Sequence, residues 1–349
     1  TFIYYNMMKT QVLFNKMLEQ VGISNVSNIL EVSRGTVQRW IDKDNIPERY
    51  IFDICRYLGE DVDYSKFNST IKDQFFTPSD ISKHCFEKFK EIVPEFKNYT
   101  FIEPSSGDGS FLNVLPEGTI AMDIEPRSES IMKCDYLLWK PPDNDKKKYI
   151  VFGNPPFGLR GHLALKFINH SYEFADYVCF ILPQLFESDG KGSPMKRVKG
   201  YNLIHSEKLS GEYNVPEGNP VMINGVFQIW SKLSSNSKYD ITSIESSVVK
   251  VYSLSDGGTP STTRNKKMLD KCHVYLPSTC FGKENMRVYD NFVELPGKKG
   301  YGLVFLKNER KMVKSSKEID WSSIAFLSTN SAYNIRTSII YKYFNNKNI

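Results

Sequence analysis

The middle of the chain alternates short apolar runs with segments of helical character. The helical segments cover residues 109–115 and 163–174. The apolar runs end at polar residues, glycine or proline, and they cover 100–103, 118–123, 149–152, 177–182 and 225–230. This alternation predicts a doubly wound α/β sheet of mainly parallel strands, whose ligands bind beyond the carboxyl ends of the strands.

The first of these runs enters a glycine-rich turn, Glu103-Pro-Ser-Ser-Gly-Asp-Gly-Ser-Phe111. Gly107 and Gly109 allow the backbone to approach a ligand closely, because no side chain intervenes. The turn matches neither the dinucleotide fingerprint nor a phosphate-binding loop, so a nucleoside triphosphate site is not expected. Glu103 ends the strand, where its carboxylate can hold an ammonium group. A turn of this kind can also be purely structural.

Two acidic residues follow at positions that suit a nucleoside. Asp123 ends the next apolar run, where a carboxylate can accept hydrogen bonds from both ribose hydroxyls. Ile124 can pack on the face of an adenine, and Asp135 can accept from its exocyclic amine. Each carboxylate alone could be a solvated loop residue; their order after the glycine-rich turn is what favours a site.

The segment Ile150-Val-Phe-Gly-Asn-Pro-Pro-Phe-Gly158 restricts the chemistry most. Two prolines fix the backbone of the turn and remove hydrogen-bond donors. The Asn154 side-chain oxygen and the Pro155 carbonyl then form two fixed acceptors, which suit an exocyclic amine that must attack an electrophile. Phe157 offers a flat apolar surface for a planar substrate. The catalytic turn is therefore predicted to comprise Asn154, Pro155, Pro156 and Phe157.

With these residues the chain resembles the S-adenosylmethionine-dependent amino-methyltransferases, and most closely the DNA adenine-N6 methyltransferases. The resemblance covers about residues 74–230, in an order similar to that of the gamma group, whose target-recognition domain is C-terminal. Gln74-Phe-Phe-Thr-Pro-Ser79 resembles the motif that contacts the methionine end of the cofactor. Tyr136 stands where these enzymes often have phenylalanine.

The resemblance implies a Rossmann-like methyltransferase sheet, S-adenosylmethionine as the cofactor and DNA as the partner. The residues that it implies for cofactor binding are Phe76, Thr77, Pro78, Glu103, Pro104, Ser105, Gly107, Gly109, Asp123, Ile124, Asp135, Tyr136 and Asn154. No metal is expected in the reaction.

The first 68 residues read as short helices. Ser33 is a candidate N-cap for a helix over 33–42, and Pro47 stands in the first turn of another. This part resembles the helix-turn-helix of phage repressors, whose second helix enters the major groove. A small helical bundle that contacts protein is the alternative. The outward-facing residues expected to contact DNA are Arg34, Thr36, Gln38 and Arg39.

The net charge of +5 is unevenly distributed along the chain. Residues 1–68 carry −1 and residues 69–235 carry −2, whereas residues 236–349 carry +8, with 18 lysines and arginines against 10 acidic residues. A segment this basic suggests a polyanionic partner. The stretch 189–200 is also basic, and it could close over nucleic acid or be a solvated loop. Phosphate contacts are expected from Lys191, Lys196, Arg197, Lys199, Lys266, Lys267, Lys298 and Lys299.

We therefore predict three regions: a helix-turn-helix-like domain (1–68), a methyltransferase domain (69–235) and an α+β target-recognition region (236–349). Six widely spaced cysteines without zinc-ligand spacing indicate reduced thiols. An intracellular, cytoplasmic protein with no membrane segment is expected.

Several functions remain open at this stage. An RNA adenine methyltransferase and a protein-glutamine methyltransferase are alternatives, because related turns present the same acceptors to other amines. A non-enzymatic DNA-binding regulator that keeps a degenerate methyltransferase fold is the third alternative. A separate restriction endonuclease partner is also left open.

Overall fold

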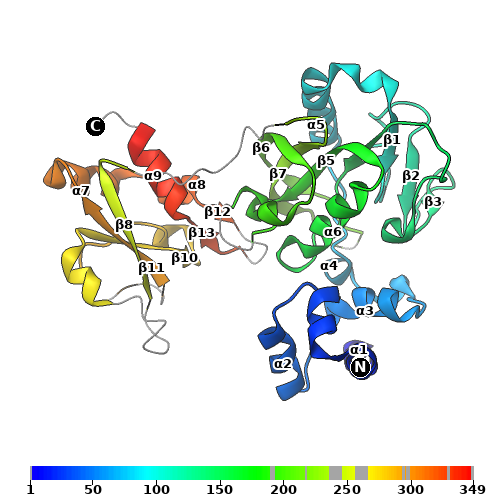
Figure 1. The fold of residues 1–349 in the computed structure, drawn as a ribbon, viewed down its shortest axis with the longest axis horizontal. Coiled ribbons are helices and arrows are strands. Elements are labelled where there is room, and N and C mark those ends of the chain that lie inside the picture. The colour runs from blue at the N-terminus through cyan, green and yellow to red at the C-terminus, as the bar shows by residue number, and fades with distance from the viewer. Residues whose placement is uncertain are drawn as a thin grey trace.

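We analysed a computed structural model of the chain, shown in Figure 1. It describes residues 2–188, 193–216, 218–235, 246–255, 266–292, 295, 299–327 and 331–346, with side chains omitted at 2–8, 70, 255 and 266–268. Within these residues, no helix is both long enough and apolar enough to cross a membrane.

The central element is a seven-stranded sheet with the strand order β3-β2-β1-β4-β5-β7-β6. The pairs among β3, β2, β1, β4 and β5 are parallel, and β7 runs antiparallel to both of its neighbours. The strands are β1 (Thr100–Glu103), β2 (Ile120–Asp123), β3 (Met132–Lys133), β4 (Tyr149–Gly153), β5 (Ala175–Pro183), β6 (Asn202–Tyr213) and β7 (Val221–Ser231). This mostly parallel sheet is consistent with the Rossmann-like methyltransferase sheet expected from the sequence.

Alternate residues of the strands pack on opposite faces of this sheet. Ile102, Val151 and Phe180 contribute to the core beneath α6 (His162–Ser171). Phe101 and Phe152 contribute to the core that α5 (Ser79–Ile92) covers. Both faces of the central strands are buried, as parallel strands require.

The helix expected over 109–115 is wrong: these residues form successive turns. Gly109 has φ +84°, and the Asp108 carboxylate accepts hydrogen bonds from the backbone N–H and the hydroxyl of Ser110. An aspartate that bonds to nearby backbone in this way competes with helix formation, and Pro116 follows too soon for a helix to develop.

The N-terminal part is helical. It contains α1 (Phe2–Ile29), interrupted by a non-helical Gly22, α2 (Arg34–Asp42), η1 (Glu48–Tyr50), α3 (Ile51–Leu58), η2 (Tyr64–Lys66) and α4 (Ser69–Lys72). The Ser33 side chain accepts a hydrogen bond from the Thr36 N–H and caps α2, as its position predicts. Val37 and Trp40 bury one side of α2 in the core of this part. Whether this unit binds DNA remains a prediction.

The C-terminal part contains two three-stranded antiparallel sheets, ordered β8-β11-β9 and β10-β13-β12. Its strands are β8 (Val249–Ser255), β9 (Val274–Pro277), β10 (Thr279–Cys280), β11 (Lys299–Phe305), β12 (Phe326–Leu327) and β13 (Tyr333–Asn334). Its helices within the described residues are η8 (Lys266–Lys271), η9 (Lys283–Asn285), α7 (Glu309–Glu318), α8 (Trp321–Ile324) and α9 (Thr337–Asn346). The Leu327 N–H donates to the Gln184 side chain at 2.9 Å, which joins this part to the end of β5.

Candidate active site

Four segments meet at the carboxyl ends of β1, β2 and β4. The Ser105 hydroxyl donates to the Asn154 carbonyl at 3.1 Å, and the Gly107 N–H donates to Asp123 at 2.8 Å. The Asn154 amide nitrogen donates to Phe75 O at 3.3 Å and to the Thr77 hydroxyl at 3.2 Å. The structure therefore brings together the upstream motif, the glycine-rich turn, Asp123 and the proline-containing turn. In a doubly wound sheet this edge is where ligands bind.

Asn154 has a fixed orientation with one free acceptor. Both partners of its amide nitrogen are oxygen atoms, so the nitrogen and oxygen ends of the side chain are distinguishable. The side-chain oxygen is buried and has no hydrogen-bond partner within the described part of the chain. An unsatisfied buried acceptor costs roughly 1–3 kcal/mol, so its persistence suits a donor supplied by a ligand.

The residues after Asn154 form a tight turn. Pro155 is buried, whereas Pro156 and Phe157 are partly buried. The N–H of Gly158 donates to the Asp73 carboxylate at 2.8 Å, which fixes the end of the turn. Gly158 has φ +68°, and a Cβ there would lie 2.6 Å from the His162 ring, so only glycine fits.

Glu103 is another buried group at this edge of the sheet with an unused oxygen. Its side chain is 1% exposed, and its Oε2 has no partner among the described residues. Burial raises the pKa of this carboxyl well above its usual range; a hydrogen bond from Ser106 opposes the shift, and the negative charges of Asp123 and Asp108 reinforce it. A cationic ligand would remove this penalty. The free acceptor thus fits the ammonium group of S-adenosylmethionine.

The glycine-rich turn lies against the upstream motif. Gly107 has φ +54°, and a Cβ on it would be 3.0 Å from the Phe76 ring. The Arg127 guanidinium lies 4.9 Å from the centre of the same ring. Thr77 is buried, Gly109 has φ +84°, and Pro104 is buried behind the turn. Pro78 precedes α5 as its N-cap residue.

The two oxygens of Asp123 are both engaged by backbone. One accepts from Gly107 and the other accepts from the Glu125 N–H at 2.8 Å. Each carboxylate oxygen has a second lone pair, so ribose hydroxyls remain possible partners. In the structure as it stands, Asp123 holds the glycine-rich turn to the end of β2.

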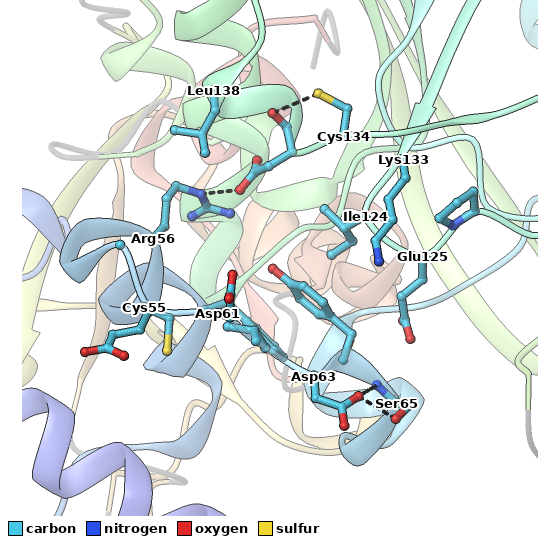
Figure 2. A pocket seen from close by; sticks show the side chains of 17 residues that line it. Cys55, Arg56, Asp61, Asp63, Ser65, Ile124, Glu125, Lys133, Cys134 and Leu138 are labelled. Atoms are coloured by element: carbon cyan, nitrogen blue, oxygen red, sulfur yellow. Dashed lines mark hydrogen bonds and ion pairs between the residues drawn. The ribbon is translucent and has the colours of Figure 1, made fainter.

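A cavity of about 940 Å³ opens beside β2 and β3. Figure 2 shows Ile124, Glu125 and Lys133 on its sheet side, and Arg56, Asp61 and Asp63 on the side of the N-terminal part. Asp135 also lines it. The volume is within the range of pockets that bind cofactors. The sequence did not point to the residues of 52–65 in this cavity, because they become its wall only when α3 packs against the sheet.

Two of the residues expected to bind the cofactor, Asp135 and Tyr136, have other partners. Asp135 accepts from Arg56 at 2.6 Å and from the Leu137 N–H, so its carboxylate is already paired, although it still lines the cavity. Tyr136 is 1% exposed, lies in the core and bonds through its hydroxyl to Ser171. Its side chain is therefore not placed to touch a ligand in the cavity, and its role is that of a core residue.

A second cavity of about 270 Å³ lies beside the proline-containing turn. Phe157, Gly158 and Phe75 line it together with residues from distant parts of the chain, among them Arg49, Asp73 and Leu327. Arg49 and Asp73 carried no recognisable signal in the sequence. Pro47 and the segment 74–79, which lie close to them in the sequence, did carry such a signal.

Residues 74–77 run between the glycine-rich turn and the proline-containing turn. The Gln74 amide donates to Glu125, which lines the larger cavity, and Phe75 lines the smaller one. Phe76 lies on Gly107, and Thr77 bonds to Asn154. Successive side chains thus alternate between the glycine-rich turn and the proline-containing turn, as in an extended strand.

A buried ionic cluster joins the N-terminal helices to α6, directly after the proline-containing turn. Asp53 accepts from His162 at 3.0 Å, from Lys166 at 2.9 Å and from Arg56 at 3.2 Å, and it is 5% exposed. Arg56 also pairs with Asp135. This cluster ties the wall of the larger cavity to the helix that begins at His162.

The residues expected to contact nucleic acid are dispersed. Arg34, Gln38 and Arg39 are exposed on α2, and Thr36, which is partly buried, bonds to Ser33. Lys196, Lys199 and Lys299 are exposed, whereas Arg197 is paired with Glu31 of the N-terminal part at 2.5 Å. Lys191 and Lys298 lie outside the described residues, as do the side chains of Lys266 and Lys267.

The sequence pattern did not single out a row of cations on α7. Arg310, Lys311 and Lys314 are exposed there, and Met312 packs inward. Because residues three or four apart share a helix face, predicting a helix over 309–318 would have placed these cations next to one another. Within the described residues, no group of three or more histidines, cysteines and acids is arranged to hold a metal ion.

Comparisons with known proteins add little. No family model matches the chain, and no curated protein matches it. Among solved structures, a protein from Pyrococcus horikoshii described as a putative RNA methyltransferase is similar over 46% of this chain and 88% of its own, with 16% identity and a TM-score of 0.34. A likeness this weak does not decide fold or function, so the site rests on its own residues.

Proposed function

We propose that this protein transfers a methyl group from S-adenosylmethionine to the exocyclic N6 amine of adenine in DNA. The observation that carries the proposal is the Asn154 side chain, whose nitrogen is held by Phe75 and Thr77 while its buried oxygen has no described partner. RNA is the alternative polymer, because the turn specifies an amine rather than a sugar.

The cofactor is expected to span the carboxyl ends of β1 and β2. Glu103 would hold its ammonium group, Asp123 its ribose hydroxyls, and Ile124 the face of its adenine. The free oxygen of Glu103 and the close approach of Phe76 to Gly107 support this placement. When bound, S-adenosylmethionine would supply an electrophilic methyl group.

Asn154 and Pro155 act on the substrate amine. The Asn154 oxygen and the Pro155 carbonyl each accept one amine hydrogen, which turns the nitrogen lone pair away from the ring and toward the electrophile. Both acceptors are held before the substrate arrives, so little reorganisation accompanies the reaction, and positioning supplies much of the rate.

An adenine in a duplex must leave the base stack to reach these acceptors. Extrusion costs a few kcal/mol, and less for a mismatched or unpaired base. Stacking on an aromatic side chain such as Phe157 offsets roughly 1–3 kcal/mol of this cost. The proposed enzyme therefore acts on a flipped base or on a single strand.

The test is tritium transfer from labelled S-adenosylmethionine to DNA, RNA and protein, followed by identification of the methylated residue. Asn154→Ala should abolish transfer and leave cofactor affinity within about threefold of the wild type, because the proposed role of the Asn154 oxygen is to hold the substrate amine, while Glu103 and Asp123 hold the ammonium and the ribose of the cofactor. Asn98→Ala, an exposed asparagine at the end of η3 (Pro94–Asn98), is the matched control and should retain full activity. Near-normal transfer by Asn154→Ala would rule out this assignment.

A further inference from the structure

The smaller cavity contains a cationic group that the methyl-transfer chemistry does not use. Arg49 belongs to η1 in the N-terminal part, is partly buried, and lines the 270 Å³ cavity with Phe75 and Phe157. No ion pair or side-chain hydrogen bond of Arg49 occurs within the described part of the chain. Its five N–H donors are thus available to a ligand.

The nearest acid on the cavity wall is otherwise engaged. Asp73 accepts from the Gly158 N–H and so fixes the end of the proline-containing turn. Burial raises the pKa of its carboxyl, while the Gly158 hydrogen bond and the Arg49 charge oppose the shift. Arg49 and Asp73 influence each other through space but are not within ion-pair distance. The arginine is therefore held near the turn without being neutralised by a direct contact.

The size and lining of the cavity suit one planar heterocycle. Pockets for drug-sized ligands range from about 300 to 1,000 Å³, so 270 Å³ is too small for a whole nucleotide. Phe75 and Phe157 provide aromatic surfaces, and Arg49 provides donors. Adenine presents ring nitrogens that are acceptors only, whereas the side chain of a protein glutamine has no ring and no second acceptor.

We infer that Arg49 is a specificity-determining residue that donates a hydrogen bond to a ring nitrogen of the target base. This assignment rests on the proposed function, and it adds to that function a residue outside the methyltransferase-like part. It also means that the N-terminal part contributes directly to the substrate site, beyond any contact that α2 makes with DNA.

The experiment uses the full-length protein and an oligonucleotide that the wild type methylates. The target adenine is replaced in turn by 1-deaza-, 3-deaza- and 7-deazaadenine, each of which keeps the amine and lacks one ring nitrogen. The wild type should lose about 10- to 100-fold in kcat/KM on one of the three analogues, as expected when a hydrogen bond to a charged group is removed. On adenine, the kcat/KM of Arg49→Ala should fall by a similar factor relative to the wild type. Replacing adenine by that same analogue should then lower the kcat/KM of Arg49→Ala no further.

Two controls separate this role from a general one. Lys83→Ala removes an exposed cation from α5 and should keep the wild-type pattern on all four substrates. Arg49→Lys keeps the charge but not the fork of donors, and it should recover only part of the discrimination. Both variants are also compared for cofactor affinity, which should not change.

The outcomes are distinguishable. If Arg49→Ala loses the same factor on adenine and on every analogue, and its salt dependence falls, Arg49 contacts phosphate and the inference is overturned. If the wild type methylates adenine but discriminates among no analogues, the inference is also overturned while the proposed function stands. If the wild type methylates no polynucleotide, the proposed function fails and the inference fails with it.

Discussion

Replacing Asp53 tests whether the ionic cluster secures the N-terminal helices to the sheet. Asp53→Ala leaves His162, Lys166 and Arg56 without their shared acceptor in a site where the Asp53 side chain is only 4% exposed. Removing one partner of a buried ion pair costs about 3–5 kcal/mol. The free energy of local unfolding of α3 should therefore fall by about that amount. The protection of the α3 backbone amides against hydrogen exchange then falls by roughly 10²- to 10³-fold or more.

The same residue gives a pH dependence with a defined sign. Burial alone would raise the pKa of Asp53, but the hydrogen bond from His162 and the charge of Lys166 outweigh burial and hold it well below 3.8. A carboxyl whose folded pKa is depressed stabilises the fold above its unfolded pKa. Its contribution is lost as the pH falls below about 3.8. Unfolding free energies of the wild type and Asp53→Ala should therefore converge on acidification.

The assay is hydrogen exchange of α3 and α6 peptides, together with urea unfolding at several pH values. Glu91→Ala is the control, because Glu91 forms an ion pair with Lys88 on the exposed surface of α5 and should change neither readout measurably. If α3 in Asp53→Ala were as well protected from hydrogen exchange at pH 7 as α3 in Glu91→Ala, the reasoning would be refuted.

Two further substitutions test the turns of the candidate site. Glu103→Gln should weaken cofactor binding, which calorimetry measures, but raise the melting temperature of the free protein at pH 8 more than at pH 4. The raised pKa of Glu103 makes its ionised form destabilising as the pH rises above 4.5. Thermal melts measure this effect, and a lower melting temperature of the variant at pH 8 would contradict it. Gly158→Ala should cost roughly 1–3 kcal/mol of unfolding free energy, because a positive φ and the His162 ring leave no room for Cβ. Gly35→Ala, in the open helix α2, is the control and should be neutral or stabilising in urea unfolding.

The strands β1, β2, β4, β5 and β7 were predictable because they are largely buried and so read as apolar runs. The strands β3 and β6 were not predicted, because many of their side chains are exposed or only partly buried and they carry no such run. Residues 149–152 and 177–182 fall within β4 and β5; Pro155 and Pro156 follow β4, and Pro183 is the last residue of β5. The helix expected at 109–115 did not form because local hydrogen bonds that Asp108 accepts from Ser110 outweighed the apolar spacing. Helix predictions for short segments are the least secure, because a few local hydrogen bonds can outweigh the sequence pattern.

The site was predictable only where chemistry and turn geometry occur in one segment. Asn154 and Glu103 stand next to residues that constrain the backbone, so their placement at the sheet edge follows from local sequence. Arg49, Asp53 and Asp73 reach the site through tertiary packing, which a linear pattern does not encode. Tyr136 shows the reverse case, since an aromatic residue next to a site residue belongs to the core.

The strand-like segment 74–77 has a consequence for how this protein can vary. Because its side chains alternate between the glycine-rich turn and the proline-containing turn, inserting or deleting one residue would exchange the side chains offered to each turn. Substitutions keep that assignment, whereas a change of length reverses it. The number of residues between α4 and α5 should therefore tolerate less variation than their identities, and attempts to redesign either turn must keep that spacing.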